Sequence, residues 1–122
     1  MAKNAAFGDG RFLSLAASAP TTPASGDPVL VGKIPGVALT DEGDGGNAAA
    51  NTSIDTSGVY DLVVEGADAS AGSAVAVGDI LYYDTAATIK INKDATNGVR
   101  FGYALGAVGS GASATIAVKV GY

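Results

Sequence analysis

Alternation between apolar and polar residues recurs along most of the chain, and this pattern predicts β-strands. Residues 58–66 place Tyr60, Leu62 and Val64 on one face of such a strand. Residues 114–120 place apolar side chains at every second position in the same way. Apart from one Ala-rich segment, no window sustains a helical period of 3.6 residues. The pattern therefore predicts an all-β fold, a small antiparallel β-barrel or sandwich with an extended N-terminal arm.

Shorter signals fill in the rest of this β pattern. Residues 11–17 and 88–92 alternate well enough to predict two more strands. The dipeptide Asn97-Gly98 favours a tight hairpin turn after the second of them. Pro35 predicts an edge, a bulge or a bend, because proline cannot donate to a central ladder. The Ala-rich residues 67–77 leave a helical turn or a loop open, with glycine and serine favouring the loop.

Two stretches of the chain nearly repeat each other, over residues 25–41 and 77–108. Each has a Gly-Asp pair that suits a turn, then an apolar run, then Gly-x-Ala-Leu, written G-x-A-L below. Glycine and alanine at alternate positions would let another strand approach closely. Two related β units that close on one another explain the pattern, and chance similarity in a Gly/Ala-rich chain is the alternative.

The first part of the chain differs from the rest. Residues 1–24 are predicted to hold an N-terminal arm, a first strand and a Pro-containing linker, and residues 25–122 a single β domain. Residues 1–10 lack any periodicity. They suit either a frayed terminus or an arm that orders on a partner, and both interpretations remain open at this point.

The composition predicts a modest core. The chain has 122 residues, 48% of them hydrophobic, but alanine accounts for 24 of these and Leu, Ile, Val and Phe together for only 28. That is about 23% of the chain, just above the level of roughly 20% below which disorder prevails. A core this thin suggests that a partner or self-association adds stability.

Charge and missing residue types narrow the function. A net charge of −5 with scattered cations argues against nucleic-acid and membrane-surface partners. The chain has no Cys and no His, which removes thiol chemistry, the usual zinc ligands and the usual general base. The sequence predicts no enzyme, no cofactor and no metal site. The acidic loop 41–46 lacks EF-hand spacing, so a solvated loop is favoured over a weak cation site.

Tyrosines offer the main alternative to a structural role. Four of them lie on apolar faces of predicted strands: Tyr60, Tyr82, Tyr83 and Tyr103. Exposed together, they would form a platform for a carbohydrate or a host surface, whereas tyrosine in strands more often belongs to a core or an interface.

The order of the segments carries a resemblance. ASGDPVLVGKIPGVALTD, SGVYDLVVEG, AVAVGDILYYD and RFGYALGAVGSGASATIAVKV follow one another over roughly residues 25–122. In this order they resemble the capsid decoration, or cement, proteins of tailed bacteriophages, which are similar in role to the lambda head-decoration protein. No single motif carries the resemblance, which rests on the sequential pattern.

The resemblance implies a structural protein of the virion. Such proteins bind the outer surface of the expanded capsid, commonly as homotrimers, and stabilise the shell against internal DNA pressure. The implied partner is the major capsid protein, and the N-terminal arm is the implied contact, by strand addition or by apolar anchors. The residues assigned to that contact are Ala2, Lys3, Asn4, Phe7, Arg11 and Phe12.

Overall fold

The computed structural model describes residues 3–4 and 10–121, and all regular structure in them is β. The strands are β1 (Phe12–Leu15), β2 (Pro28–Val31), β3 (Ile34–Ala38), β4 (Thr52–Asp55), β5 (Val59–Glu65), β6 (Ile80–Tyr83), β7 (Ile91–Asn92), β8 (Val99–Ala104) and β9 (Ser113–Val120). The predicted all-β fold is confirmed.

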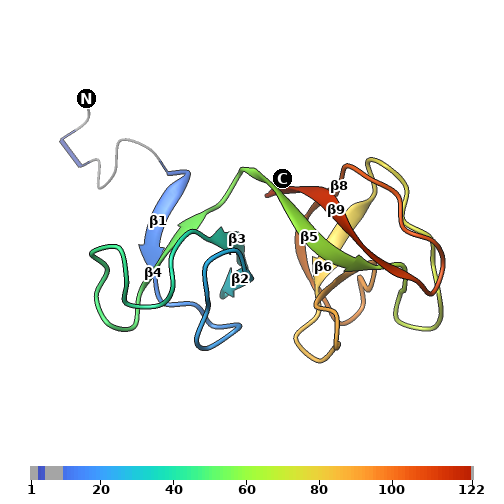
Figure 1. Ribbon diagram of the computed structural model, residues 1–122, viewed down its shortest axis with the longest axis horizontal. Coiled ribbons are helices and arrows are strands. Elements are labelled where there is room, and N and C mark those ends of the chain that lie inside the picture. Colours follow the sequence, from blue (N-terminus) through green and yellow to red (C-terminus); the bar gives the residue numbers. More distant parts are fainter. Residues whose placement is uncertain (1–2, 5–9, 122) are drawn as a thin grey trace.

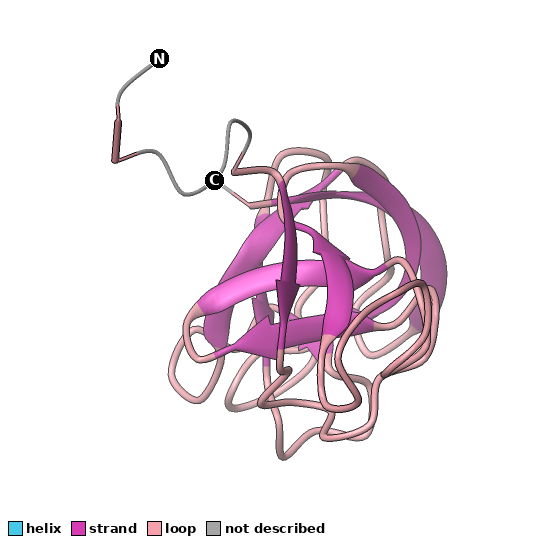
Figure 2. Ribbon diagram, turned by 90° about the vertical axis from the view of Figure 1, so that its left-hand side faces the viewer, coloured by secondary structure: helices cyan, strands magenta, loops and turns pink. Residues whose placement is uncertain are grey.

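The strands form two bodies that lie side by side along the long axis of the molecule (Figure 1). The first is a four-stranded antiparallel sheet in the order β1-β4-β3-β2. The second is a barrel that closes in the order β5-β7-β6-β8-β9. Its pairings are antiparallel except for one parallel contact, Val64 opposite Ile91. Viewed from the end that carries the first sheet, the strands of both bodies overlap in one rounded outline (Figure 2).

The two bodies share one plan. In chain order the first sheet uses β1, β2, β3 and β4, and the barrel uses β5, β6, β8 and β9, with β7 inserted. The lateral orders match as well, because β1-β4-β3-β2 corresponds strand for strand to β5-β9-β8-β6. The similar segments seen in the sequence supply β2 and β3 in one body and β6 and β8 in the other.

The Gly-Asp pairs form the same turn in both bodies. Gly26 has φ of +92° and Gly78 has φ of +91°, a region that residues with a Cβ atom rarely adopt. The Oδ2 atoms of Asp27 and Asp79 each accept a hydrogen bond, at 2.9 Å, from the backbone N–H three residues earlier. Aspartate therefore closes the turn and glycine provides its backbone conformation, as expected from the pair.

The G-x-A-L segments also make matching contacts. The N–H of Gly26 donates to the carbonyl of Ala38 at 2.8 Å, and that of Gly78 donates to Ala104 at 2.7 Å. A Cβ atom at Gly102 would lie 2.0 Å from the carbonyl oxygen of Lys119 on the next strand. The glycine of the second G-x-A-L segment, Gly102, therefore permits β8 and β9 to approach closely, which confirms the interpretation made from the sequence.

Two apolar clusters support the bodies. The larger fills the barrel, and its members with no exposed surface are Val64, Leu81, Phe101, Ala104, Val118 and Val120. The smaller lies on one face of the first sheet around Val29, Ala38 and Ile54, with Leu13 and Leu15 packed against it. Leu30 and Val37, on the other face of the first sheet, belong to the barrel's cluster. The two bodies are therefore packed together through this second face.

Three local expectations are settled by the structure. The predicted strand 88–92 is wrong in length, since only Ile91 and Asn92 are in β7. Asn97-Gly98 is not a two-residue hairpin turn, because β7 pairs with β6 and β5 rather than with β8. Instead, Asp94 accepts the N–H groups of Thr96 and Asn97 in a longer loop. Residues 67–77 form a loop with isolated bridges, as the glycine and serine content favoured.

Candidate functional site

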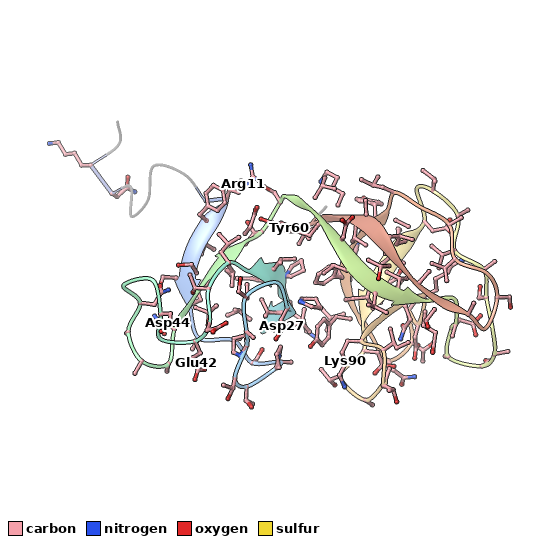
Figure 3. All side chains as sticks on the ribbon, viewed as in Figure 1. Arg11, Asp27, Glu42, Asp44, Tyr60 and Lys90 are labelled. Atoms are coloured by element: carbon pink, nitrogen blue, oxygen red, sulfur yellow. The ribbon has the colours of Figure 1, made fainter. Side chains whose placement is uncertain are left out.

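The root of the N-terminal arm is held by a buried carboxylate. Asp55, at the end of β4, has no exposed surface, and Arg11 reaches it with two hydrogen bonds of 2.9 Å. The hydroxyl of Tyr60 donates to the same carboxylate at 2.6 Å. The backbone N–H groups of Ser57 and Gly58 donate to it at 3.0 and 3.1 Å. Figure 3 shows Arg11 and Tyr60 close together where the first sheet meets β5.

These five hydrogen bonds change the ionisation of Asp55. The guanidinium of Arg11 holds the pKa of Asp55 well below its ordinary range, and this outweighs the opposite effect of burial. Burial raises the pKa of Tyr60, and its hydrogen bond to Asp55 acts in the same direction. The site therefore contains a carboxylate that stays ionised and a phenol that stays neutral, which suits a fixed structural anchor.

The backbone is shaped around this anchor. A Cβ atom at Gly58 would lie 2.4 Å from Oδ2 of Asp55, so glycine leaves room for the carboxylate. The carbonyl oxygen of Arg11 accepts hydrogen bonds from the N–H and the hydroxyl of Thr56, at 2.9 and 2.8 Å. Arg11 is thus bound through its side chain and through its backbone, so the chain is fixed where the arm joins the body.

Phe12 is the exposed apolar group at this root. Its side chain is 48% exposed, and the Arg11 guanidinium carbon lies 4.7 Å from its ring centroid. Leu13 and Leu15, by contrast, point into the small cluster of the first sheet. The alternation along β1 therefore leaves Phe12 on the outside with an apolar ring that a partner can cover.

The residues assigned to the capsid contact have different positions. Arg11 and Phe12 are adjacent at the root of the arm, and Lys3 and Asn4 are exposed. Ala2 and Phe7 lie outside the described residues. The structure therefore brings together two of the six residues in one described site.

Sequence reasoning missed Asp55 and Tyr60 as members of this site. A signal was present in Asp55-Thr56-Ser57-Gly58, because aspartate followed by small residues and glycine is typical of a turn closed by the aspartate side chain. The pairing with Arg11 spans 44 residues, and nothing in the local pattern points to it. Tyr60 was assigned to the apolar face of its strand, and nothing in that pattern shows that its hydroxyl donates a hydrogen bond to Asp55.

A cleft of about 340 Å³ lies between the two bodies. It is lined by the turn at Gly26–Pro28, by β5 at Asp61–Val63 and by residues 88–91. Asp27 and Lys90 are on opposite sides of the junction between the bodies (Figure 3). The Asp27 carboxylate caps its own turn, and Asp61 is exposed to solvent. The cleft therefore lacks the paired, desolvated carboxylates that acid–base catalysis needs.

The acidic loop lies apart from this site. Figure 3 places Glu42 and Asp44 at the far side of the first sheet from the barrel. The Oδ1 atom of Asp41 accepts the backbone N–H of Ser25 at 2.8 Å, which is a turn contact. Within the described ranges 3–4 and 10–121, no three acidic side chains are grouped so that they could hold a metal ion. Nor does that part of the chain contain a helix able to cross a membrane.

The four tyrosines do not form an exposed platform. Tyr83 is 2% exposed and lies 6.2 Å from Phe101, centroid to centroid, in the barrel core. Tyr60, Tyr82 and Tyr103 are half-buried. Burial raises the pKa of Tyr83, as expected for a phenol within a core. The prediction that strand tyrosines belong to a core is confirmed for Tyr83.

Comparison with known proteins identifies the family. The family model described as phage cement protein matches residues 7–120. No curated protein and no solved structure gives a significant match to the chain. Because the family model covers nearly the whole chain, this protein belongs to the phage cement protein family, a structural family of the phage capsid with a decoration role.

Proposed function

We propose that this protein binds the outer surface of the expanded capsid through residues 2–12 and stabilises the shell there. Its direct partner is the major capsid protein, and it is a homotrimer on the virion surface. The observation that carries the proposal is the anchored root of the arm, where buried Asp55 binds Arg11 beside the exposed Phe12.

A fixed root favours binding by the residues that precede it. An anchored segment loses less conformational freedom on binding than a free one, so more of the contact energy contributes to affinity. Strand addition uses backbone N–H and C=O groups, and the small side chains of Ala2, Ala5, Ala6 and Gly8 do not obstruct such pairing at a sheet edge of the partner. Phe7 and Phe12 would then supply apolar anchors in pockets of the capsid surface.

The alternative function, a carbohydrate- or host-surface-binding module, has no supporting observation. It required the tyrosines to be exposed together, and Tyr83 is buried. The cement function is therefore the one that the site and the family support.

The test is co-sedimentation with purified expanded capsids that lack the decoration protein. Deletion of residues 1–9 removes most of the arm and keeps Gly10, Arg11 and the Asp55 contacts. We expect full-length protein to sediment with the particles at micromolar concentration and the deleted protein to stay in solution. Unchanged melting of the deleted protein is the control for its fold.

A second variant locates the anchor more sharply. Phe12→Ser removes the exposed ring, and Ile34→Ser removes an apolar side chain of similar exposure, 41%, at the first residue of β3. Capsid binding should weaken at least about tenfold for the first variant and stay unchanged for the second. Full capsid binding by the arm deletion would overturn the proposed contact, and a full-length protein that never sediments would overturn the function.

A further inference from the structure

The outer side of the barrel carries an apolar surface on four neighbouring strands, β5, β9, β8 and β6. The register places Val59 opposite Lys119, Lys119 opposite Tyr103, and Tyr103 opposite Ile80. A second row runs from Asp61 through Ala117 towards Leu105. The rows are continuous because each strand is hydrogen-bonded to the next. We call this surface the outer wall.

Exposed apolar side chains concentrate on the outer wall. Eight large hydrophobic side chains are exposed among the described residues, and five of them lie on this wall or directly beside it. They are Val59 (57%), Val63 (51%), Val77 (68%), Ile80 (36%) and Leu105 (44%). Lys119 and Asp61 lie among these apolar side chains, so the wall is mixed. Exposed apolar side chains that gather on one surface, with charged residues beside them, commonly mark a contact with a partner.

Because the two bodies share one plan, the face of the first sheet that corresponds to the outer wall can be identified and its burial compared. Val37 and Tyr103 both follow the glycine of G-x-A-L, and their opposite residues on the next strand are Asp55 and Lys119. In the first sheet this face is covered, since Val37 is 1% exposed and packs in the barrel's cluster. In the barrel the matching face is only partly covered. Tyr103 is half-buried with the Arg100 guanidinium carbon 5.4 Å from its ring centroid, and Asp61 and Val63 border the cleft between the bodies, whereas Leu105 is 44% exposed.

The charged residues of the outer wall favour a second copy of this chain as the partner that binds there. Asp61 and Lys119 lie on adjacent strands of the wall, with opposite charges. The ion pairs found among the described residues are Arg11–Asp55 and Lys93–Asp79, so Asp61 and Lys119 are not paired with each other. A second copy presents the same two charges and the same apolar side chains, and can pair each charge with its opposite.

We propose that the outer wall is the surface on which a second copy of this chain docks. Val63, Leu105 and their apolar neighbours form the contact, and Asp61 of one copy pairs with Lys119 of another. This inference deepens the proposed homotrimer and rests on it, but it does not depend on the arm or on capsid binding. Self-association in solution therefore tests it separately.

The chain offers a matched pair of variants for this test. Leu39 and Leu105 occupy the same position of the two G-x-A-L segments, with 37% and 44% of the side chain exposed. The N–H of each donates to the next strand, to Ser53 and to Ala117, at 2.8 and 2.9 Å. Only Leu105 is on the outer wall, so Leu39→Asp controls for the effect of an exposed charge on this backbone.

The measurement is sedimentation equilibrium at physiological salt, from micromolar to millimolar protein. The natural protein and Leu39→Asp should self-associate alike, and Leu105→Asp should raise the dissociation constant at least about tenfold. Val63→Asp, on a different strand of the wall, should do the same and serves if Leu105→Asp fails to fold. Asp61→Lys and Lys119→Asp should each weaken association, and the double variant should restore it.

Each other outcome contradicts the proposal. A natural protein that remains monomeric throughout the range overturns it, even if capsid binding succeeds. If Leu39→Asp and Leu105→Asp weaken self-association equally, the contact between copies does not lie on the outer wall. If the natural protein is monomeric and Leu105→Asp no longer sediments with capsids, the outer wall binds the capsid protein and not a second copy. Self-association that depends on the wall, with no capsid binding, keeps this inference and overturns the proposed function.

Discussion

The first sheet and the barrel are built on the same four-strand plan, yet one stays open and the other closes. The difference lies in the connection between the second and third strands of the plan, β2 to β3 in the sheet and β6 to β8 in the barrel. Between β2 and β3 only Gly32 and Lys33 intervene, whereas residues 84–98 intervene between β6 and β8. That insertion contains β7, which pairs with both β6 and β5 and so closes the ring.

Closure decides where the core lies. The barrel encloses a cluster of its own, around Phe101 and Leu81. The open sheet has a small cluster on one face and covers its other face against the barrel, through Leu30 and Val37. The packing of one body on the other therefore removes Leu30 and Val37 from water and stabilises the first sheet.

Matched positions consequently have different roles. Asp55 and Lys119 occupy corresponding places, opposite Val37 and Tyr103. Asp55 is completely buried and anchors the arm, whereas Lys119 is exposed and its amino group lies 6.0 Å from the Tyr103 ring centroid. Asp55 and Lys119 therefore differ in their contribution to stability because only Asp55 is buried, although both occupy the same position of the repeated plan.

The largest expected effect concerns the paired glycines. Gly102→Ala would bring a Cβ atom to 2.0 Å from a backbone oxygen of β9, whereas Gly36→Ala would bring one to 3.2 Å from the carbonyl of Asp55. We expect Gly102→Ala to lower the free energy of unfolding by about 3 kcal/mol or more and Gly36→Ala by about 1 kcal/mol. Urea unfolding measures both, and equal losses would mean that the two strand pairs approach equally closely.

The next effect separates the two matched charges. Asp55→Ala removes the acceptor of five hydrogen bonds and should cost about 2 to 3 kcal/mol, since the hydroxyl of Tyr60 and two backbone N–H groups lose their partner. Lys119→Ala, at the exposed matching position, should change stability by no more than about 0.5 kcal/mol. Thermal and urea unfolding of both variants test this, and a larger loss at Lys119 would reverse the comparison.

Acid should weaken the Asp55 anchor as well. The pKa of Asp55 is lowered in the folded protein, so its contribution to stability is full above the ordinary aspartate pKa of about 3.9. It is lost progressively as the pH falls below that value, because the unfolded chain takes up the proton first. The stability difference between the natural protein and Asp55→Asn should therefore shrink between about pH 5 and pH 2. A constant difference would contradict this.

The smallest effect concerns a single hydroxyl. Tyr60→Phe keeps the ring and removes one hydrogen bond to Asp55, so it should cost about 1 kcal/mol. The control is Tyr103→Phe, which removes the half-buried hydroxyl that accepts a hydrogen bond from Arg100; we expect a smaller loss there, because neither of these residues is fully buried. Unfolding in urea measures both, and a negligible loss for Tyr60→Phe would show that water replaces the hydroxyl at the carboxylate.

Much of the fold could be predicted because it depends on local patterns. Tyr60, Leu62 and Val64 alternate along β5 as expected, and all-β structure follows from such alternation. The Gly-Asp turns were recognisable from residue types alone. Glycine allows a positive φ, the aspartate side chain accepts a backbone N–H, and each pair comes directly before an apolar run. The length of β7 and its neighbours were not predictable, since both depend on strands far away in sequence.

The candidate site was predictable only in part. Arg11 and Phe12 stand out as a charged and a large apolar residue at the end of an unpatterned segment. Their environment was not visible, because Asp55 reads locally as one more turn aspartate. Its burial and its five hydrogen bonds exist only once β1 lies beside β4 and the chain continues into β5.

By itself, the sequence determined that the chain is all-β, that its two similar segments begin with the same turn, and that it resembles the capsid cement proteins. These properties follow from residue types and short spacings, which act through local sterics and hydrogen bonds. Only the tertiary structure decided which copy closes into a barrel, which matched face is covered and where the arm is anchored. Those outcomes depend on contacts between residues distant in the chain, because burial, and with it the strength of an ion pair, arises only when the bodies pack together.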